Sequence, residues 1–255
     1  MNKLKLFIIP ALIILFWWIS SQLNLLNDYI MPSPNKVLAS AYILIKKGSL
    51  QRHLVVSLYR VLSGFIITFA IAFPLAIIVG LNKTFLKYLM PLLQFIRHIP
   101  PIALIPMLIL WFGIGEMSKL SVIILATFFP IFLNTLNGIV HCDKNLVEVG
   151  IVYGFSKKNI FLRIILPQAM PSVIVGMQLG LGYSWRSLMG AELIAASSGI
   201  GYMIIEAEQL SRPDIILVGI LAIGFIGCIA DYTFTKITRY LKFFNEGNLY
   251  GRSHY

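Results

Sequence analysis

The sequence predicts an all-α integral membrane protein with about six transmembrane helices. Hydrophobic residues make up 58% and charged residues 12% of the 255 residues, which is more apolar side chain than one water-soluble core of this size buries. Long runs without any charge recur along the chain, for example 120–140 and 164–185. Runs of this length cross a bilayer as helices.

Basic residues indicate how these spans are oriented. A net charge of +11 would suit a nucleic-acid partner, but Lys and Arg lie mostly between the apolar runs, so we expect no nucleic acid among the partners. Cytoplasmic loops of membrane proteins are enriched in Lys and Arg. With the N-terminus inside, the larger share of them falls on the inner side. Both termini are therefore predicted to be cytoplasmic (N-in/C-in).

The first predicted span is 6–23, a charge-free run that follows the basic tail 1–5. A secretory signal peptide begins similarly, but no small-x-small cleavage site follows, and the run is long enough to span. Residues 1–29 are therefore assigned to an N-terminal transmembrane helix.

An outer segment, 30–56, separates the first span from the rest. Its MPSP sequence at 31–34 is predicted to stop one helix and start another, because proline is tolerated at the start of a helix but not inside it. Residues 36–47 have the pattern of an amphipathic helix that lies on the outer membrane face.

Residues 57–235 form the predicted core, and 236–255 a basic cytoplasmic tail. The core contains the second to sixth spans, which are expected at 57–81, 88–115, 120–140, 172–191 and 215–232. Arg60, near the outer end of the second span, is expected to extend its charge to the interface. An outer turn is expected at 116–119. Gly176, Gly180 and Gly182 of the fifth span are expected to allow close helix approach.

The third span is interrupted by Arg97, His98 and the pair Pro100–Pro101. Irregular backbone at membrane depth survives only inside protein or along a water-filled cavity, so this span is predicted to line a pathway. His98 is either a satisfied polar residue or a pathway residue. No second His or Cys lies near it, and Cys142 and Cys228 lack metal-ligand spacing, so no metal site is predicted.

Segment 143–167 is a polar stretch between two apolar runs. Its sequence predicts a short helix, a turn at Gly154 and a second helix that Ser156 caps and that Pro167 and Pro171 end. Both helices carry an apolar face. That face either folds back on the chain's own bundle or docks into a groove on a soluble partner.

The same segment resembles the cytoplasmic EAA coupling loop, E-A-A-x3-G-x9-I-x-L-P, of permease subunits of bacterial ATP-binding-cassette (ABC) importers. The matching residues are Glu148, Gly154, Ile164, Leu166 and Pro167. Val149 and Gly150 stand where the loop has two alanines. The resemblance implies that segment 143–167 docks on an ATPase subunit.

The wider chain resembles the branch of these permeases that serves nitrate, aliphatic sulfonates, taurine and bicarbonate. The similar runs are IRHIPPIALIPMLILWFGIGEMSK from Ile96 and MGAELIAASSGIGYMI from Met189. The resemblance implies a type I importer in the bacterial cytoplasmic (inner) membrane. Its partners would be cytoplasmic ABC ATPases, an extracytoplasmic solute-binding protein and a second, often identical permease. This chain would bind no cofactor, because the partner hydrolyses the ATP.

Arg186, inside the fifth span, bears on the substrate. Glu192 lies about 240° around the same helix and is a poor partner for it. Arg186 therefore either faces a cavity and stabilises an anion in transit, or belongs to an ion pair or reaches an interface. Trp185, His98 and Glu192 complete the candidate pathway set. Expected substrates are anions such as a sulfonate, taurine or nitrate; the alternative is a heteroaromatic vitamin precursor.

An autonomous membrane protein is the competing class. The sequence has no G-x-x-x-x-G-K-[ST] loop and no nucleophile–base pair, so we expect neither an ATPase nor another enzyme. A secondary transporter would need an ionisable relay across the spans. Arg186, Glu192 and Asp231 are too few to form one, so the importer permease is the favoured function.

Overall fold

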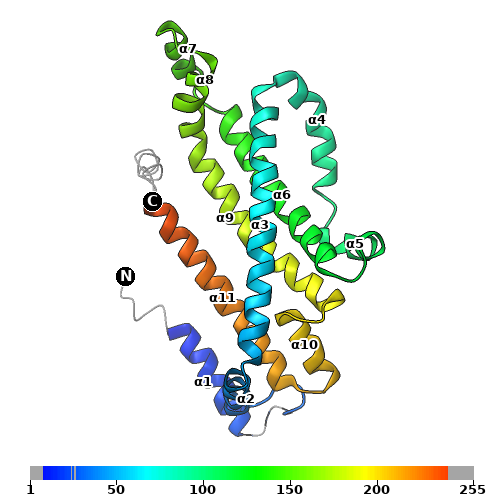
Figure 1. Ribbon diagram of the computed structural model, residues 1–255. Helices are drawn as coiled ribbons and strands as arrows, with labels where there is room; N and C mark the ends of the chain where they lie inside the picture. The colour runs from blue at the N-terminus through cyan, green and yellow to red at the C-terminus, as the bar shows by residue number, and fades with distance from the viewer. Residues whose placement is uncertain (1–7, 24, 26, 241–255) are drawn as a thin grey trace. The chain divides into compact units, whose positions relative to one another are not determined.

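The computed structural model describes residues 8–23, 25 and 27–240, and every regular element in that part of the chain is helical (Figure 1). The elements are α1 (Ile8–Gln22), α2 (Pro34–Lys46), α3 (Ser49–Leu81), α4 (Lys83–Ile96), the 3₁₀ turn η2 (Pro101–Leu104), α5 (Ile105–Phe112), α6 (Glu116–Val140), α7 (Lys144–Val152), α8 (Lys157–Ile160), the π turn η3 (Phe161–Ile165), α9 (Leu166–Ala195), α10 (Ile200–Gln209) and α11 (Pro213–Tyr240). The all-α prediction is confirmed.

Four helices in the described residues are long and apolar enough to cross a membrane. They are Ser49–Leu81, Glu116–Val140, Lys157–Ile194 and Pro213–Thr238. A fifth span forms if Thr84–Ile96 and Pro101–Phe112, bent by 78°, are counted as one broken helix. This is the span that the sequence predicts to be interrupted. Helix α1 is apolar but shorter, with 15 residues. Residues 6–7 of the predicted first span and residues 241–255 of the predicted tail lie outside the described part.

Two predicted boundaries are wrong. Helix α3 begins at Ser49 rather than near residue 57, because Gly48 adopts a φ of +70° and reverses the chain directly after α2. The residues expected as an outer turn at 116–119 form the first turn of α6 instead.

The chain divides into two compact units. Unit 1 comprises 1–58 and 192–226, and unit 2 comprises 59–191 and 227–255. Helices α3, α9 and α11 each contribute one part to both units. Segments far apart in the sequence therefore meet within each unit.

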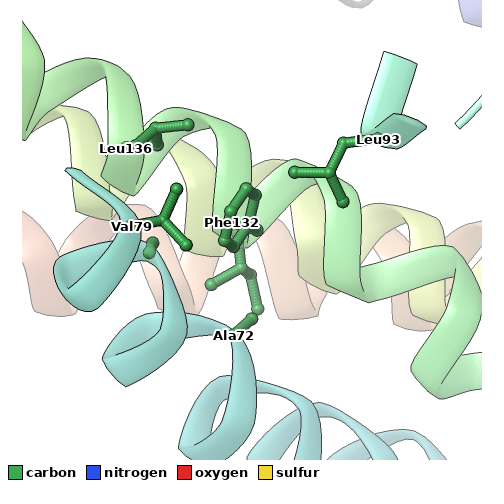
Figure 2. Packing of buried hydrophobic residues seen from close by; sticks show 7 residues of the cluster. Ala72, Val79, Leu93, Phe132 and Leu136 are labelled. Atoms are coloured by element: carbon green, nitrogen blue, oxygen red, sulfur yellow. The ribbon is translucent and has the colours of Figure 1, made fainter. Parts of the chain in front are cut away.

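The core of unit 2 is a cluster of buried apolar side chains from α3, α4 and α6 (Figure 2). It consists of Ala72, Ala76, Val79, Leu93, Ile131, Phe132 and Leu136. The small alanines of α3 let Phe132 of α6 fill the space between the helices. This close packing fixes the helices that flank the broken span.

Helix α9 packs against α6 through glycines, as the sequence predicts. A Cβ added at Gly176 would lie 2.9 Å from the Pro130 carbonyl oxygen, and one at Gly180 would lie 3.0 Å from Ile131 Cγ1. Gly182 has no atom within 4 Å of such a Cβ, so it plays no part in this approach. Close contact between backbones replaces side-chain interlocking at this helix pair.

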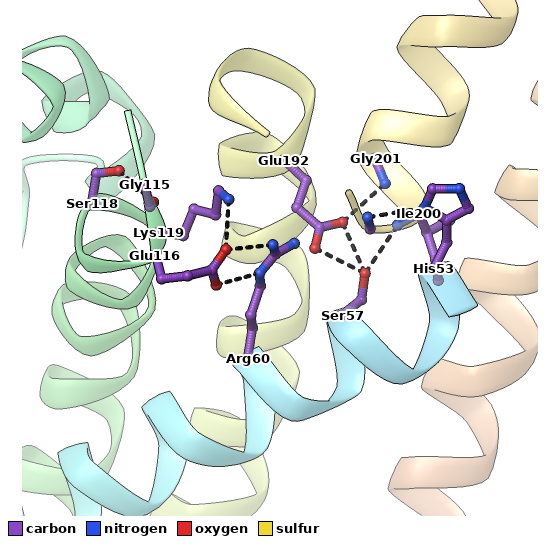
Figure 3. Close-up of polar contacts among 11 residues, drawn as sticks. His53, Ser57, Arg60, Gly115, Glu116, Ser118, Lys119, Glu192, Ile200 and Gly201 are labelled. Carbon is purple, nitrogen blue, oxygen red and sulfur yellow. Dashed lines mark hydrogen bonds and ion pairs between the residues drawn. The ribbon is translucent and has the colours of Figure 1, made fainter. Parts of the chain in front are cut away.

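A cluster of charges in unit 2, with two buried cations and an exposed carboxylate, corrects the expectation for Arg60 (Figure 3). Arg60 does not reach an interface: its Nε and Nη2 donate to the two oxygens of Glu116, at 2.7 and 2.6 Å. Lys119 Nζ donates to Glu116 Oε1 at 2.9 Å and is itself buried. Burying cations in an apolar helix bundle is costly unless a carboxylate accepts from them, which Glu116 does.

In unit 1, Glu192 holds the N-terminus of α10 (Figure 3). Its carboxylate accepts from Ser57 Oγ at 2.8 and 2.9 Å and from the Gly201 N–H at 3.0 Å, while Ser57 Oγ accepts from the Ile200 N–H at 3.0 Å. Gly199 N–H donates to His53 Nδ1 at 3.1 Å. The first amides of α10, which have no partner within the helix, thus find acceptors.

A second carboxylate in unit 1 joins α2 to the start of α11. Asp214 is buried and accepts from Ser40 Oγ. It also accepts a bidentate pair from Arg212, Nε to Oδ1 at 2.9 Å and Nη2 to Oδ2 at 2.6 Å. Hydrogen bonding to this carboxylate raises the pKa of Arg212 above its usual value.

We expect Gly199→Ala to lower the apparent melting temperature of the purified protein. Gly199 has a φ of +114°, and an added Cβ would lie 2.2 Å from Glu192 Oε1. Backbone strain alone costs about 1–3 kcal/mol, and each kcal/mol lowers the melting temperature by roughly 2–4 °C in a chain of this size. Intrinsic fluorescence during heating in detergent measures it.

Gly224→Ala is the matched control, because Gly224 has no atom within 4 Å of an added Cβ and no positive φ. It should melt like the wild type. Equal melting temperatures for Gly199→Ala and Gly224→Ala would contradict this account of the α10 N-terminus.

Candidate functional site

Helices α7 and α8 form a tight turn at the end of α9 in unit 2 (Figure 1). Asp143 caps α7 by accepting from the Asn145 N–H at 2.9 Å. At the other end, Gly154 has a φ of +74°, its N–H donates to the Ile151 carbonyl, and the Phe155 N–H donates to the Gly150 carbonyl. This is a Schellman motif, so the predicted turn residue is confirmed.

Ser156 caps α8, as the sequence predicts, by accepting from the Asn159 N–H at 3.3 Å. Gly150 lets the two helices approach closely: an added Cβ would lie 2.7 Å from Ile164 Cδ1. Beside this contact is a cleft of about 280 Å³. Its lining residues are Leu146, Val149, Gly150, Tyr153, Phe155, Arg163, Ile164, Pro167 and Gln168.

The prediction that Pro167 and Pro171 end the second helix is wrong. The helix continues from Lys157 through the π turn η3 into α9. In that turn the Leu166 N–H donates to the Phe161 carbonyl, five residues back, so the hydrogen-bond ladder is already shifted where Pro167 lacks its N–H. Pro171 removes one further donor without breaking the helix.

Part of the apolar face of this loop is buried within it and part is exposed. Ile160 and Gly150 are buried between α7 and α8. Val152 and Tyr153 at the end of α7 are 85% and 77% exposed. Folding back on the chain therefore accounts for Gly150 and Ile160, while docking on a partner stays a prediction for the exposed Val152 and Tyr153.

The remaining loop residues support the turn. Gln168 Oε1 accepts from the Asp143 N–H at 3.0 Å and from Cys142 Sγ at 3.1 Å, which ties the loop to α9. Burial raises the pKa of the Cys142 thiol, so this cysteine stays a neutral donor. Glu148 is exposed, and Leu166 is half-buried.

The four predicted pathway residues lie in different surroundings. Arg186 is exposed, with its guanidinium carbon 5.8 Å from the centre of the Tyr183 ring. Trp185 is partly buried, and its indole Nε1 is 3.6 Å from where a Cβ at Gly227 would lie. His98 is exposed in the break after α4. Glu192 is 1% exposed and serves α10 in unit 1.

A pocket of about 320 Å³ lies in unit 2 at the bend between α4 and η2. It is lined by Ile96, Arg97, Ile99, Pro101, Leu104, Leu125, Ala126, Phe129, Pro130, Leu133, Asn134, Leu179, Tyr183 and Ser187. The residues come from the bend itself, from α6 and from α9. Neither His98 nor Arg186 lines it.

Sequence reasoning missed Arg97, Tyr183 and Ser187 as candidate site residues. The sequence marks Arg97 as an interruption of the third span but assigns it no binding role, although its place just before the proline pair is a usable signal. Tyr183 and Ser187 sit one helical turn apart on α9, and nothing in their local sequence marks the face that they share. That face becomes visible only once α4 and α6 are in place.

Replacing Gly154 should loosen the α7–α8 turn. The methyl group of Gly154→Ala causes no clash, since no atom lies within 4 Å of an added Cβ. The φ of +74°, however, costs alanine about 1–2 kcal/mol. Hydrogen exchange at the amides of residues 154 and 155 should become roughly 5- to 30-fold faster. Mass-spectrometric exchange on the purified protein measures this.

Gly182→Ala is the matched control, because Gly182 is helical, also has free space and has no positive φ. Its exchange at residues 154–155 should equal the wild type. Unchanged exchange in Gly154→Ala would show that the turn does not depend on this glycine.

Comparison with known proteins shows which family the chain resembles. The family described as "Binding-protein-dependent transport system inner membrane component" matches residues 72–241, which include the bend, the α7–α8 loop and α9. A solved chain of the inward-facing MetNI methionine ABC transporter superposes with a TM-score of 0.55 at 16% identity, covering 70% of this chain and 92% of that one. The predicted permease fold is confirmed.

Two curated relatives agree with this assignment. SsuC of Bacillus subtilis, whose name assigns it to aliphatic sulfonate transport, is 37% identical over 228 residues, 89% of this chain and 83% of SsuC. TauC of Escherichia coli, a taurine transport system permease protein, is 31% identical over 236 residues, 91% of this chain and 86% of TauC. The chain therefore belongs to the inner membrane components of binding-protein-dependent transport systems, the permease subunits of ABC importers.

Proposed function

We propose that this chain forms the pathway by which a small anion enters the cell, delivered by a solute-binding protein and driven by a separate ATPase. Membership of the family implies both kinds of partner. The observation that supports the proposal is the α7–α8 loop, in which a hydrogen-bonded turn presents Val152 and Tyr153 exposed at the end of α7. In this proposal the chain hydrolyses no ATP itself and binds no cofactor.

The exposed end of α7 is the proposed contact with the ATPase. Val152 and Tyr153 are exposed at the end of α7, and the exposed Lys157 and Lys158 follow in the same loop. Aromatic and apolar contacts with a polar rim are typical of docking sites. Glu148, also exposed, offers a carboxylate for a charge-assisted contact at the same loop. Gly154, Ile164, Leu166 and Pro167 act by shaping the loop.

Helix continuity supports mechanical coupling between this loop and the membrane. Because α8, η3 and α9 form one helix from Lys157, a displacement of the loop moves α9 as a rigid body. Opening and closing of the ATPase pair would thereby reorient the span that carries Arg186.

An anion is the proposed substrate. Arg186 is exposed within an apolar span, and no carboxylate among the described residues forms an ion pair with it. A charge at this depth must face protein or water rather than lipid. We place Arg186 toward the pathway, between two copies of this chain. Trp185, which precedes it in α9, and His98, in the break after α4, are the other proposed pathway residues. Substrates that carry a sulfonate group also fit the names of SsuC and TauC.

The outer helices are the proposed receptor for the solute-binding protein. Helices α2 and α10 belong to unit 1, where Asp214 and Glu192 hold them in place. Glu192 then acts by fixing this surface rather than by touching substrate.

Tyr153→Asp should prevent the ATPase from binding. The tyrosine is 77% exposed, so the change leaves the fold intact, but it puts a charge into the proposed apolar contact. Loss of a contact worth at least about 2 kcal/mol lowers affinity roughly 30-fold. The test co-expresses the tagged chain with the ATPase from a neighbouring gene and measures how much co-purifies.

Tyr29→Asp provides the control, since Tyr29 is equally exposed but precedes α2 in the outer segment. It should retain the ATPase. Full co-purification with Tyr153→Asp, or no ATPase with the wild type, would remove the coupling-loop proposal.

Arg186→Ala should abolish uptake while the ATPase still co-purifies, because the change removes the proposed cation of the pathway and leaves the loop untouched. Arg186→Lys keeps the charge and should retain part of the uptake. Uptake of a radiolabelled alkanesulfonate into cells that express the whole importer measures it. Normal uptake by Arg186→Ala would exclude this arginine from the pathway.

A further inference from the structure

The pocket at the α4–η2 bend has one charged lining residue, Arg97. No carboxylate lines it, and none among the described residues forms an ion pair with Arg97. A guanidinium presents several donors in a fixed fork that matches an oxyanion. The pocket therefore carries a net positive charge that a ligand can neutralise.

Two hydroxyl groups on α9 also line the pocket. Ser187 is 7% exposed, and within the described residues neither its hydroxyl nor that of Tyr183 has a hydrogen-bond partner. Tyr183 is 47% exposed, and both hydroxyls have a donor left for a ligand oxygen in the pocket. The Asn134 amide, held by its bond to the Pro130 carbonyl at 2.8 Å, lies at the same wall.

The rest of the wall is apolar. It includes Ile96, Leu104, Leu125, Phe129, Leu133 and Leu179. At about 320 Å³ the pocket is of the size that holds a small organic molecule. An inorganic anion of a few atoms would leave most of these apolar side chains without contacts.

We propose that this pocket binds an organic monoanion with an apolar body and no ammonium group, such as an alkanesulfonate. The sulfonate oxygens accept from Arg97 and from the hydroxyls of Tyr183 and Ser187, and the alkyl chain lies against α6 and α9. This assignment rests on the proposed import of anions and narrows its substrate class. It makes Arg97 a binding residue separate from Arg186.

The same chemistry discriminates against taurine, a zwitterion, and against the bicarbonate anion. Taurine and 1-propanesulfonate have the same shape, but taurine carries an ammonium group where propanesulfonate has a methyl group. With Arg97 as the charged lining residue, that ammonium finds no carboxylate and loses its water. Bicarbonate has no apolar part to bury. Both should bind more weakly than propanesulfonate.

The test measures equilibrium binding of radiolabelled 1-propanesulfonate to the full-length chain, purified with its ATPase in lipid nanodiscs, with unlabelled competitors. Affinity should rise about fourfold per methylene from ethane- to hexanesulfonate, the change that about 0.8 kcal/mol per buried CH₂ gives. Taurine should compete at least about tenfold more weakly than propanesulfonate, and bicarbonate should not compete.

Arg97→Ala should weaken binding about 10- to 100-fold, because a charge-assisted hydrogen-bonded pair is lost. Ser187→Ala, a smaller change, should weaken binding about threefold or more. It tests the pocket if Arg97→Ala fails to assemble with the ATPase. Arg52→Ala is the matched control: Arg52 is an exposed arginine that does not line the pocket, so binding should be unchanged.

Equal competition by taurine and propanesulfonate, or unchanged binding in both Arg97→Ala and Ser187→Ala, would overturn the pocket assignment. Failure of the proposed function looks different, because then no ATPase co-purifies with the wild type. If the complex forms and takes up propanesulfonate while both variants behave normally, only the pocket assignment fails.

Discussion

The helix that begins at Lys157 and runs through η3 into α9 is the element on which the other features depend. Pro167 and Pro171 remove two backbone donors from it, yet it stays unbroken because the π turn shifts the ladder before Pro167 and because a bundle tolerates a missing donor. Its N-terminal end carries the proposed ATPase contact. Its interior carries Tyr183, Arg186 and Ser187. In the proposed function, this one continuous helix connects the ATPase contact with the substrate pathway.

Polar contacts between helices stabilise each unit internally. Glu116 accepts from buried Arg60 and Lys119 in unit 2, and Glu192 accepts from Ser57 and α10 in unit 1. Without water, a buried charge or amide is stable only if such an acceptor is present. These carboxylates are therefore structural, whereas Arg97 and Arg186 have no carboxylate partner in the described chain. That contrast separates the cations that support the fold from those that are available to a ligand.

The break in the third span both places Arg97 and forms the wall of a pocket. Its bend of 78° interrupts the helix at Arg97, and the interruption opens a pocket that α6 and α9 close on the other sides. Backbone irregularity of this kind is tolerated at membrane depth only beside protein or a cavity. The pocket, the glycine contacts of α9 with α6, and the packed alanines of α3 are consequences of the same close helix packing.

The sequence by itself determined what depends on composition and local conformation. Apolar runs set the all-α membrane class, the Pro100–Pro101 pair predicted the break, and Gly154 and Ser156 predicted the loop's turn and cap, because φ preference and capping act over a few residues. Only the tertiary structure decided which partner each buried charge has: Arg60 and Glu116 are 56 residues apart, and Ser57 and Glu192 are 135 apart. It also made Arg97, which the sequence marks only as an interruption of the third span, a residue that lines a pocket. Helix packing, which no local pattern encodes, brings such distant side chains together.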